Sequence, residues 1–346
     1  MRKLLFLILL CTVVVLPVSA SELTAPEAPP SAREYMPEDT ASFANGLEQL
    51  LRKALALVRP DLKEASESMV AVLAVVLILA LLETFSGSTK KIADLAGVSA
   101  ICAILMSSTN SLIHLGSEAL AQLQEYGKLL LPVMTAAMAA QGGITTSAAL
   151  YTGTVMFNSL LTNLLTKLLI PMVYLFLALA AANAATGEEL LKKLRDTAKI
   201  FTGWCLKTLL TVFTTYMGIT GILSGTTDAA ALKAVKITFS TFVPVVGGIL
   251  SDASEAVLVS AGLARNAAGL YGIFAVLALL VEPFVRIGIH YLLLKAAAAL
   301  SGIFGTKRMA ELIGDFSTAM GLLLAMTGSA CVIQLISTIC FMKGVS

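Results

Sequence analysis

Long uncharged apolar stretches alternate with short charged segments along most of this chain. Residues 95–115 form 21 consecutive positions without a formal charge, and residues 168–187 and 208–227 form 20 each. A helix needs about 20 mostly apolar residues to cross the hydrocarbon core of a bilayer. Together with the apolar stretches 68–82 and 316–342, these segments predict an all-α, polytopic transmembrane helical bundle over residues 68–346.

The middle of this pattern does not divide into spans by charge alone. The uncharged stretch between Lys128 and Lys167 contains 38 residues, which is too long for one crossing. Gln141–Gly143 is a natural break, because paired glycines weaken a helix. We therefore expect three short spans in this part of the chain, at residues 129–143, 145–163 and 168–187.

The first 20 residues have the pattern of a secretory signal peptide. Arg2 and Lys3 precede an apolar run at residues 4–16, Pro17 interrupts it, and small residues follow up to Ala20. As a helix this run rises only about 20 Å, less than a hydrocarbon core of about 30 Å. We expect cleavage after Ala20, and an uncleaved membrane anchor is the alternative.

Residues 21–67 are predicted to form an extracytoplasmic region before the membrane domain. Residues 21–42 contain four prolines and five acidic residues, a composition typical of a solvated linker. Apolar residues at helical spacing then predict an amphipathic helix over residues 43–58, which Pro60 and Asp61 are expected to end. This helix either lies on the lipid surface or docks an extracytoplasmic partner.

Basic residues predict which turns face the cytoplasm. Lys90–Lys91, the polar segment 188–199 and Lys307–Arg308 are the basic clusters that separate apolar stretches. The positive-inside rule assigns them to the cytoplasmic side, which places the 116–128 loop and the C-terminus outside. The assignment requires an odd number of crossings between residues 129 and 187.

The composition agrees with a membrane protein and excludes several other classes. Hydrophobic residues make up 57% of the 346 positions, charged residues make up only 13%, and the mean hydropathy is +0.88. The 24 basic and 22 acidic side chains nearly cancel, which removes the usual charge signature of a nucleic-acid-binding protein. Two histidines and five cysteines provide little material for a metal site or a disulfide framework.

The sequence contains none of the common catalytic motifs. It has no G-x-x-x-x-G-K-[ST] phosphate loop, no H-E-x-x-H pair and no G-x-S-x-G turn. We therefore predict no catalytic residue, no cofactor-binding residue and no metal ligand, and we expect that the protein is not an enzyme.

The segment over residues 237–251 is predicted to be broken or re-entrant. It contains only 15 uncharged residues, among them Pro244 and the pair Gly247–Gly248, which weaken a helix. Non-helical backbone at membrane depth is tolerated only where protein buries it or where it lines a water-filled cavity. With the charges around it, this segment defines a candidate polar path or subunit contact made of Lys207, Asp228, Lys236, Pro244, Gly247, Gly248, Asp252, Glu255, Arg265, Glu282 and Arg286.

Several of these charges also have purely structural interpretations. Lys207 lies near the end of an apolar stretch, where a lysine often extends its amine to the membrane interface. Glu282 and Arg286 are four residues apart on one helix face, so they are expected to pair with each other. Asp252 and Glu255 are equally consistent with ordinary loop acids.

The segment around residues 227–253 resembles a known protein family. Thr227–Asp228, Ala231–Lys236, Phe242–Gly248 and Ser251–Ala253 are similar to the signature of the stage III sporulation protein AE family. The order of a signal sequence, a proline-rich stretch and a multi-span body is similar too. The resemblance covers essentially the whole mature chain, although only this segment is specific.

The resemblance implies a role in endospore formation. It implies a permease-like membrane subunit in the mother-cell membrane that surrounds the forespore. This subunit would act with the other stage III A proteins, a separate ATPase and a forespore-side partner in a channel or secretion-like complex that sustains late forespore gene expression. The missing phosphate loop agrees with energy supplied by a separate ATPase. No catalytic residues are implied.

Two other functions remain open at this point. A stand-alone secondary transporter would bind a small solute at a broken helix near the membrane midplane. A structural scaffold for ring-forming partners would tolerate neutral substitutions at the charged positions but not changes in the helix at 43–58.

Overall fold

A computed structural model describes residues 25–40, 42–85, 90–140, 144–219, 267–304 and 307–343. All regular secondary structure in these ranges is helical, as the apolar pattern predicts. The expected signal peptide and the segment 237–251 lie outside the described residues, so both remain predictions.

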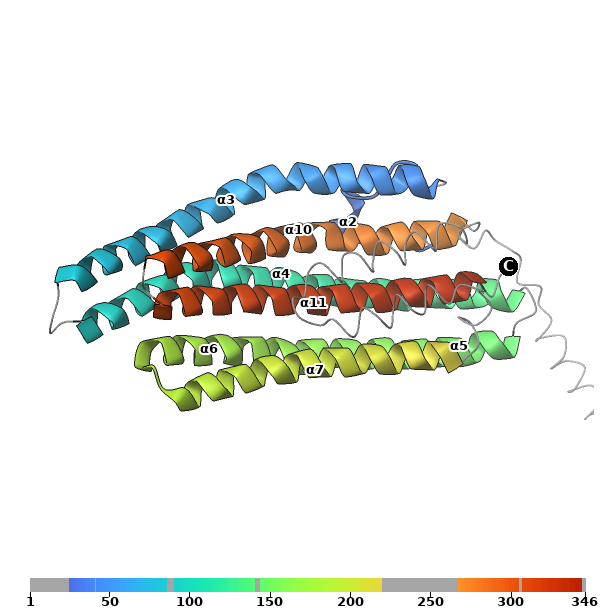
Figure 1. Ribbon diagram of the computed structural model, residues 1–346. Helices are drawn as coiled ribbons and strands as arrows, with labels where there is room; N and C mark the ends of the chain where they lie inside the picture. Colours follow the sequence, from blue (N-terminus) through green and yellow to red (C-terminus); the bar gives the residue numbers. More distant parts are fainter. Residues whose placement is uncertain are drawn as a thin grey trace, which may run out of the picture.

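The described helices run side by side and form one elongated bundle (Figure 1). After a short N-terminal helix α2 the chain forms long rods that alternate in direction, and α5, η1 and α6 together make up one of these rods. Their bounds are α2 Pro30–Arg33, α3 Phe43–Phe85, α4 Lys90–Ala140, α5 Ile144–Leu164, η1 Leu165–Leu169, α6 Ile170–Thr186, α7 Glu189–Ile219, α10 Ala267–Ile303 and α11 Lys307–Lys343.

Five of the described helices are long and apolar enough to cross a membrane, judged by length and composition. They occupy Phe43–Leu82, Ile92–Ala136, Tyr151–Thr186, Gly269–Ile303 and Lys307–Met342. The chain is therefore a multi-pass helical membrane protein. The expected span at 208–227 is only partly covered, because the description of α7 ends at Ile219.

Helix α11 forms the core of the bundle. It lies between α10 and the α6–α7 pair (Figure 1), and 94% of its most apolar stretch is buried. Phe316, Ala319 and Met320 in its first half and Phe341 near its end are almost completely inaccessible. Helix α11 is thus shielded from lipid by its neighbours, although it is long and apolar enough to cross a membrane.

The three basic turns lie at one end of the bundle. The α3–α4, α6–α7 and α10–α11 connections all lie at the left end in Figure 1, next to Lys90, the segment 188–199 and Lys307–Arg308. A common side for these turns is what the positive-inside rule requires. Their cytoplasmic location remains a prediction. We call this end of the molecule the basic end.

The exposed side chains of α3 change character along the helix. Its first part exposes charged residues, among them Glu48, Arg52, Lys63 and Glu67, and its last part exposes Val70, Leu77, Ile78 and Leu81. Helix α4 shows the same change, from exposed Ile92, Leu95 and Met106 to exposed His114, Glu118 and Glu125. The half of this hairpin near the basic end therefore has the apolar surface that lipid contact requires.

Three boundaries predicted from the sequence are wrong. Helix α3 continues through Pro60 to Phe85, so the amphipathic stretch 43–58 is the beginning of the first long helix. The expected loop at 116–128 lies inside α4, which is one helix from Lys90 to Ala140. Residues 144–186 form one continuous rod, so a single pass replaces the predicted short spans after residue 143. The number of passes changes, but its parity does not.

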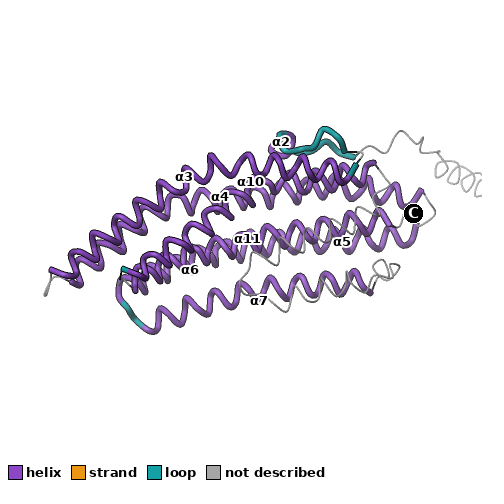
Figure 2. Tube along the Cα trace, turned by 45° about the horizontal axis from the view of Figure 1, so that its top comes forward, coloured by secondary structure: helices purple, strands orange, loops and turns teal. Residues whose placement is uncertain are grey.

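The proline-rich segment is packed against the bundle and is not a solvated linker over residues 25–40. Ala28, Ala32 and Tyr35 are buried. The backbone N–H of Ala28 donates to the Tyr271 hydroxyl on α10 at 3.1 Å, and Lys53 on α3 donates to two carbonyls of the segment at 2.7 and 2.8 Å. Figure 2 shows α2 and its flanking loops beside α3, away from the basic end.

A π-helical turn interrupts the rod formed by α5 and α6. It covers Leu165–Leu169 and contains the exposed Lys167, while Leu165 and Leu169 are buried. Helix α6 then ends at Gly187, whose φ of 75° is the left-handed conformation that glycine adopts without a Cβ penalty. The turn to α7 is therefore tight and leaves α6 and α7 antiparallel.

Candidate functional site

Three charged side chains meet where α3 packs against α10. Asp61 follows Pro60 in the middle of α3, and Glu282 and Arg286 lie on one face of α10, on either side of Pro283. We call Asp61, Glu282 and Arg286 the charged cluster. It brings together two residues predicted from the sequence and one that was not.

Arg286 is positioned between the two carboxylates. Its Nε atom lies 3.4 Å from Asp61 Oδ1 and 3.4 Å from Glu282 Oε1. The exposed fraction of the side chain is 7% for Asp61, 28% for Glu282 and 42% for Arg286. The cluster therefore extends from a buried carboxylate to a half-exposed guanidinium, which connects the interior of the helix contact to the surface.

The hydrogen bonding of the charged cluster is incomplete. Asp61 Oδ2 and Arg286 Nε are buried and have no hydrogen-bond partner among the described residues. A buried carboxylate oxygen or guanidinium N–H without a partner is costly, because desolvation is not repaid. Asp61 Oδ2 can accept a further hydrogen bond, and Arg286 Nε can donate one. Either bond can form with water or after the two side chains rearrange.

Both helices carry a proline at this level. A proline has no N–H to donate to the carbonyl four residues earlier, which frees the carbonyls of Ala56 in α3 and Leu279 in α10. Helix α3 bends along its course in Figure 1, and prolines are the usual cause of such bends. The charged cluster thus lies where both of its helices are locally weakened.

Two further residues border the charged cluster. His290 lies one turn beyond Arg286, and its Nδ1 donates to the Arg286 carbonyl at 3.0 Å, which fixes the proton on Nδ1. Tyr35 from the N-terminal segment is buried on the other side, and burial, with the charge of Glu282 second, raises the pKa of its hydroxyl. The N-terminal segment and the cluster are therefore electrostatically coupled.

Of the remaining predicted site residues, the structure describes Lys207. Lys207 lies on α7 and is exposed there, on a different side of the bundle core. Asp228, Lys236, Pro244, Gly247, Gly248, Asp252, Glu255 and Arg265 lie outside the described residues. Among the three members of the predicted set that the structure describes, Glu282 and Arg286 lie together and Lys207 lies apart from them.

Asp61 is the residue that sequence analysis missed. It was interpreted with Pro60 as the end of a surface helix. The buried positions of α3 include Leu50, Asp61, Ala65 and Met69, which share one helical phase on both sides of Pro60. The sequence signal for Asp61 was this apolar stripe, which continues past Pro60 and contains a single carboxylate.

A buried arginine, Arg195, lies between α7 and α11. Arg195 Nη1 donates to Asp315 Oδ2 at 2.7 Å, and Arg195 Nη2 and Nε donate to Asp196 Oδ1 at 2.9 and 3.0 Å. Its side chain is only 9% exposed. We call Arg195, Asp196 and Asp315 the anchor cluster. It joins the α6–α7 hairpin to the start of α11 near the basic end.

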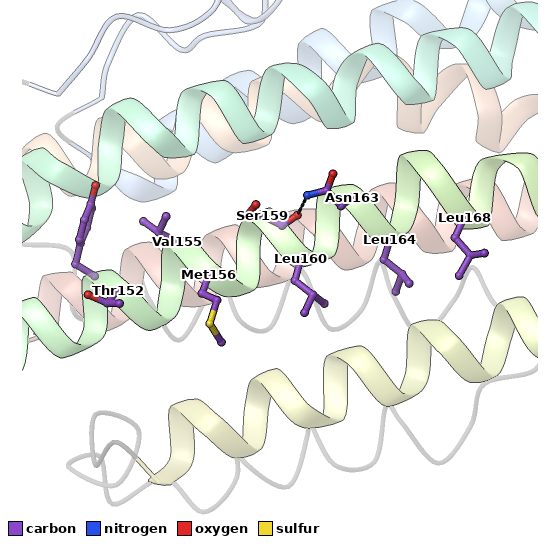
Figure 3. Close-up of a pocket in the computed structure, with 9 residues that line it drawn as sticks. Thr152, Val155, Met156, Ser159, Leu160, Asn163, Leu164 and Leu168 are labelled. Carbon is purple, nitrogen blue, oxygen red and sulfur yellow. Dashed lines mark hydrogen bonds between the residues drawn. The ribbon is translucent and has the colours of Figure 1, made fainter.

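An open groove follows one face of α5. It has a volume of about 920 Å³ and is lined by nine residues from Tyr151 to Leu168, none of them charged. Figure 3 shows Met156, Leu160, Leu164 and Leu168 pointing the same way, toward the side on which α7 lies. This groove is apolar and contains nothing suited to general acid–base or metal chemistry.

Few of the described side chains are placed for metal or thiol chemistry. Within the described ranges, no group of three or more His, Cys, Asp or Glu side chains could hold a metal ion. The described cysteines, Cys102, Cys205, Cys331 and Cys340, lie in helices. The charged cluster is the strongest functional candidate, because it combines buried charge, unsatisfied polar atoms and helix-breaking residues.

Comparison with known proteins gives one consistent result. A family model described as stage III sporulation protein AE matches residues 33–344. A curated protein of Bacillus subtilis (strain 168), named Stage III sporulation protein AE, is 23% identical over 198 residues, which cover 57% of this chain. The match spans 49% of that relative, about half its length. No solved structure matches the chain.

Proposed function

Because the chain belongs to the stage III sporulation protein AE family, we propose that it is the permease-like membrane subunit of a channel between mother cell and forespore. Membership in the family implies a role in sporulation. The channel role goes further. It requires that the membrane domain contain a polar path or a subunit contact that changes during transport.

The charged cluster is the observation that supports this proposal. Buried charges in membrane bundles are costly and usually mark ion or substrate pathways or the contacts that control them. Here the buried carboxylate of Asp61 and the guanidinium of Arg286 lie between two proline-containing helices and retain unsatisfied atoms. A purely structural ion pair gains stability by completing its hydrogen bonds.

The proposed setting is the mother-cell membrane that surrounds the forespore. The partners would be the other stage III A proteins, a separate ATPase and a forespore-side channel component. The absence of a phosphate-loop motif from the printed sequence supports an energy source outside this chain. The complex would sustain late forespore gene expression after engulfment.

The polar path itself is proposed to include more than the charged cluster. Lys207 and the residues predicted around the segment 237–251 would contribute to it or to the contact with a neighbouring subunit. Pro244 and Gly247 are the most informative of these, because their substitution by leucine strengthens a helix without adding charge.

Complementation of a deletion strain tests the proposal. We expect the deletion to complete engulfment, to leave shrunken forespores and to lower the number of heat-resistant spores. Arg286→Gln, Asp61→Asn and the double variant Pro244→Leu with Gly247→Leu should fail to restore spore numbers although they insert in the membrane. Glu48→Gln should restore them, because Glu48 pairs with Arg52 only on the exposed surface.

Each result has a distinct meaning. Normal sporulation of the deletion strain would contradict the family-based role. Normal sporulation with stably inserted charge variants would exclude the polar path and favour a scaffold. Uptake of a small solute by the purified protein alone would instead favour an independent transporter.

A further inference from the structure

A second groove lies between α7, α10 and α11, on a different side of the bundle from the charged cluster. Its volume is about 760 Å³, within the range of about 300–1,000 Å³ that is typical of ligand pockets. It extends along α11 from Gly314 to Ala325, which is about 16 Å of helix. We call it the lysine groove.

All charged residues that line the lysine groove are basic. Lys199 and Lys207 on α7 and Lys295 on α10 are exposed, and none of them forms an ion pair with a described residue. Asp315, one residue beyond the groove-lining Gly314, is bound by Arg195. Lys199 also acts electrostatically on Asp315, though more weakly than Arg195 does. Among the described residues, Lys207 and Lys295 therefore face the groove without a matching negative charge.

The floor of the lysine groove is apolar and smooth. Small residues cover much of it, among them Gly203, Ala298, Gly314, Gly321 and Ala325. Ser317 also lines the groove, but its hydroxyl already donates to the Tyr291 carbonyl at 3.1 Å. An occupant of the floor therefore needs apolar surface and has no need to hydrogen-bond to it.

The edge of the lysine groove has the character of a lipid-facing surface. Trp204 is 61% exposed and Ile200 is 70% exposed. Lys199 ends the polar segment 188–199, and Ile200 begins the apolar run that follows it. Tryptophan and lysine are the residues that commonly occupy the boundary between lipid headgroups and acyl chains.

We propose that the lysine groove binds an anionic phospholipid. The phosphate would lie between Lys199 and Lys295, and an acyl chain would follow the small-residue floor toward Lys207. Basic pockets between membrane helices are a known mode of recognition for anionic headgroups, and lysine binds phosphate as a flexible point charge. A partner helix with an acidic residue would satisfy the same amines, but it would have to cover Trp204 and Ile200 as well.

Trp204 makes this site directly observable. It is the one tryptophan in the 346-residue chain, so the tryptophan fluorescence of the protein comes from the lysine groove. The purified full-length protein would be reconstituted in phosphatidylcholine vesicles that contain either dibrominated phosphatidylglycerol or the same amount of dibrominated phosphatidylcholine. Bromine quenches tryptophan only in close contact. We expect the anionic lipid to bind about ten-fold more tightly than the zwitterionic lipid.

Neutral variants test the role of the amines. Lys199→Gln, Lys207→Gln and Lys295→Gln combined should make the two brominated lipids quench equally. The matched control combines Lys63→Gln, Lys128→Gln and Lys167→Gln, which removes the same charge from exposed positions outside the groove and should keep the preference.

Three outcomes would overturn the proposal. Equal quenching of the wild-type protein by both lipids would show that the groove does not select a headgroup. Quenching by neither lipid would show that protein covers Trp204, as a partner helix would. If the preference for the anionic lipid survives the triple substitution, residues other than the three lysines cause it. The wild-type comparison decides the main point even if a variant is unstable, and it does not depend on the role in sporulation.

Discussion

Arg195 and Arg286, which both lie between helices of this bundle beside two carboxylates, have contrasting surroundings. Arg195 in the anchor cluster is 9% exposed, and three of its nitrogens hydrogen-bond to carboxylates at 2.7 to 3.0 Å. Arg286 in the charged cluster is 42% exposed, and it lies 3.4 Å from each of its two carboxylates. No proline lies near the first cluster in α7 or α11, whereas both helices of the second contain one.

The difference separates a structural ion pair from a functional candidate. The anchor cluster satisfies its charges in one geometry, so it fixes the α6–α7 hairpin against α11. The charged cluster leaves Asp61 Oδ2 and Arg286 Nε without partners among the described residues, so its hydrogen bonding is not complete in this geometry. Buried charge alone does not single out a candidate site, whereas incomplete pairing beside weakened helices does.

The largest expected effect is the loss of the anchor cluster. Arg195→Met leaves the buried carboxylate of Asp315 without its partner and should lower the free energy of unfolding by about 3–5 kcal/mol. Denaturant titration of the purified protein in detergent, followed by far-UV circular dichroism, measures this loss. Adding Asp315→Leu should restore most of it, because an apolar pair replaces the ionic one.

The control for this prediction is an ion pair on the surface. Arg52 contacts Glu48 at 2.6 Å, but both side chains are largely exposed. Arg52→Met should cost only about 0.2–1 kcal/mol. Equal losses for Arg195→Met and Arg52→Met would contradict the structural role of the anchor cluster.

A smaller loss of stability is expected at the charged cluster. Arg286→Met should lower the free energy of unfolding by about 1–2 kcal/mol, between the values for exposed and buried pairs. The same titration measures it. Spore formation should nevertheless fall more with Arg286→Met than with Arg195→Met combined with Asp315→Leu. If Arg286→Met lowers the free energy of unfolding as much as Arg195→Met does, the charged cluster is a structural ion pair too.

The smallest effect concerns Tyr35, which borders the charged cluster. Burial first and the charge of Glu282 second raise the pKa of Tyr35 above its ordinary value of 10.0. A raised pKa in the folded state contributes stability below about pH 10, and this contribution is lost as the pH rises through the folded value. The difference in tyrosinate absorbance between wild type and Tyr35→Phe reports this titration.

A second substitution separates the two causes of that shift. Glu282→Gln removes the charge but leaves the burial, so it should bring the pKa of Tyr35 only part of the way back toward its ordinary value. An unchanged titration would mean that Glu282 does not act on the N-terminal segment.

The fold class and the grouping of the turns could be predicted from the sequence, because a bilayer imposes simple rules. Backbone groups must be satisfied within a helix in lipid, so each apolar stretch such as residues 168–187 becomes helical. The basic turns beginning at Lys90, Glu188 and Lys307 share one end in the structure. These predictions need only local composition.

Boundaries and docking could not be predicted in the same way. Pro60 ends an isolated helix, but inside a bundle its neighbours support the chain, so α3 continues to Phe85. Residues 25–40 have the composition of a linker, yet Ala28 and Tyr35 are buried by contacts with distant helices. Both errors arise where tertiary contacts outweigh local preference.

The candidate site was predicted in part for the same reason. Glu282 and Arg286 are four residues apart, so their common face follows from helix geometry alone. The contribution of Asp61 depends on the packing of α3 against α10, which joins positions more than two hundred residues apart. No local pattern contains that information.

The π-helical turn at Leu165–Leu169 divides one long rod into two independently phased parts. A π turn holds about one residue more than an α turn, so the stripe of α5 is rotated by about 100° relative to that of α6. A π turn can shift along a helix while the helix stays continuous. If the π turn shifts by one helical turn, the residues between its old and new positions rotate about the helix axis. The ends of the rod keep their places. The rod formed by α5, η1 and α6 therefore contains a point about which one part can rotate relative to the other.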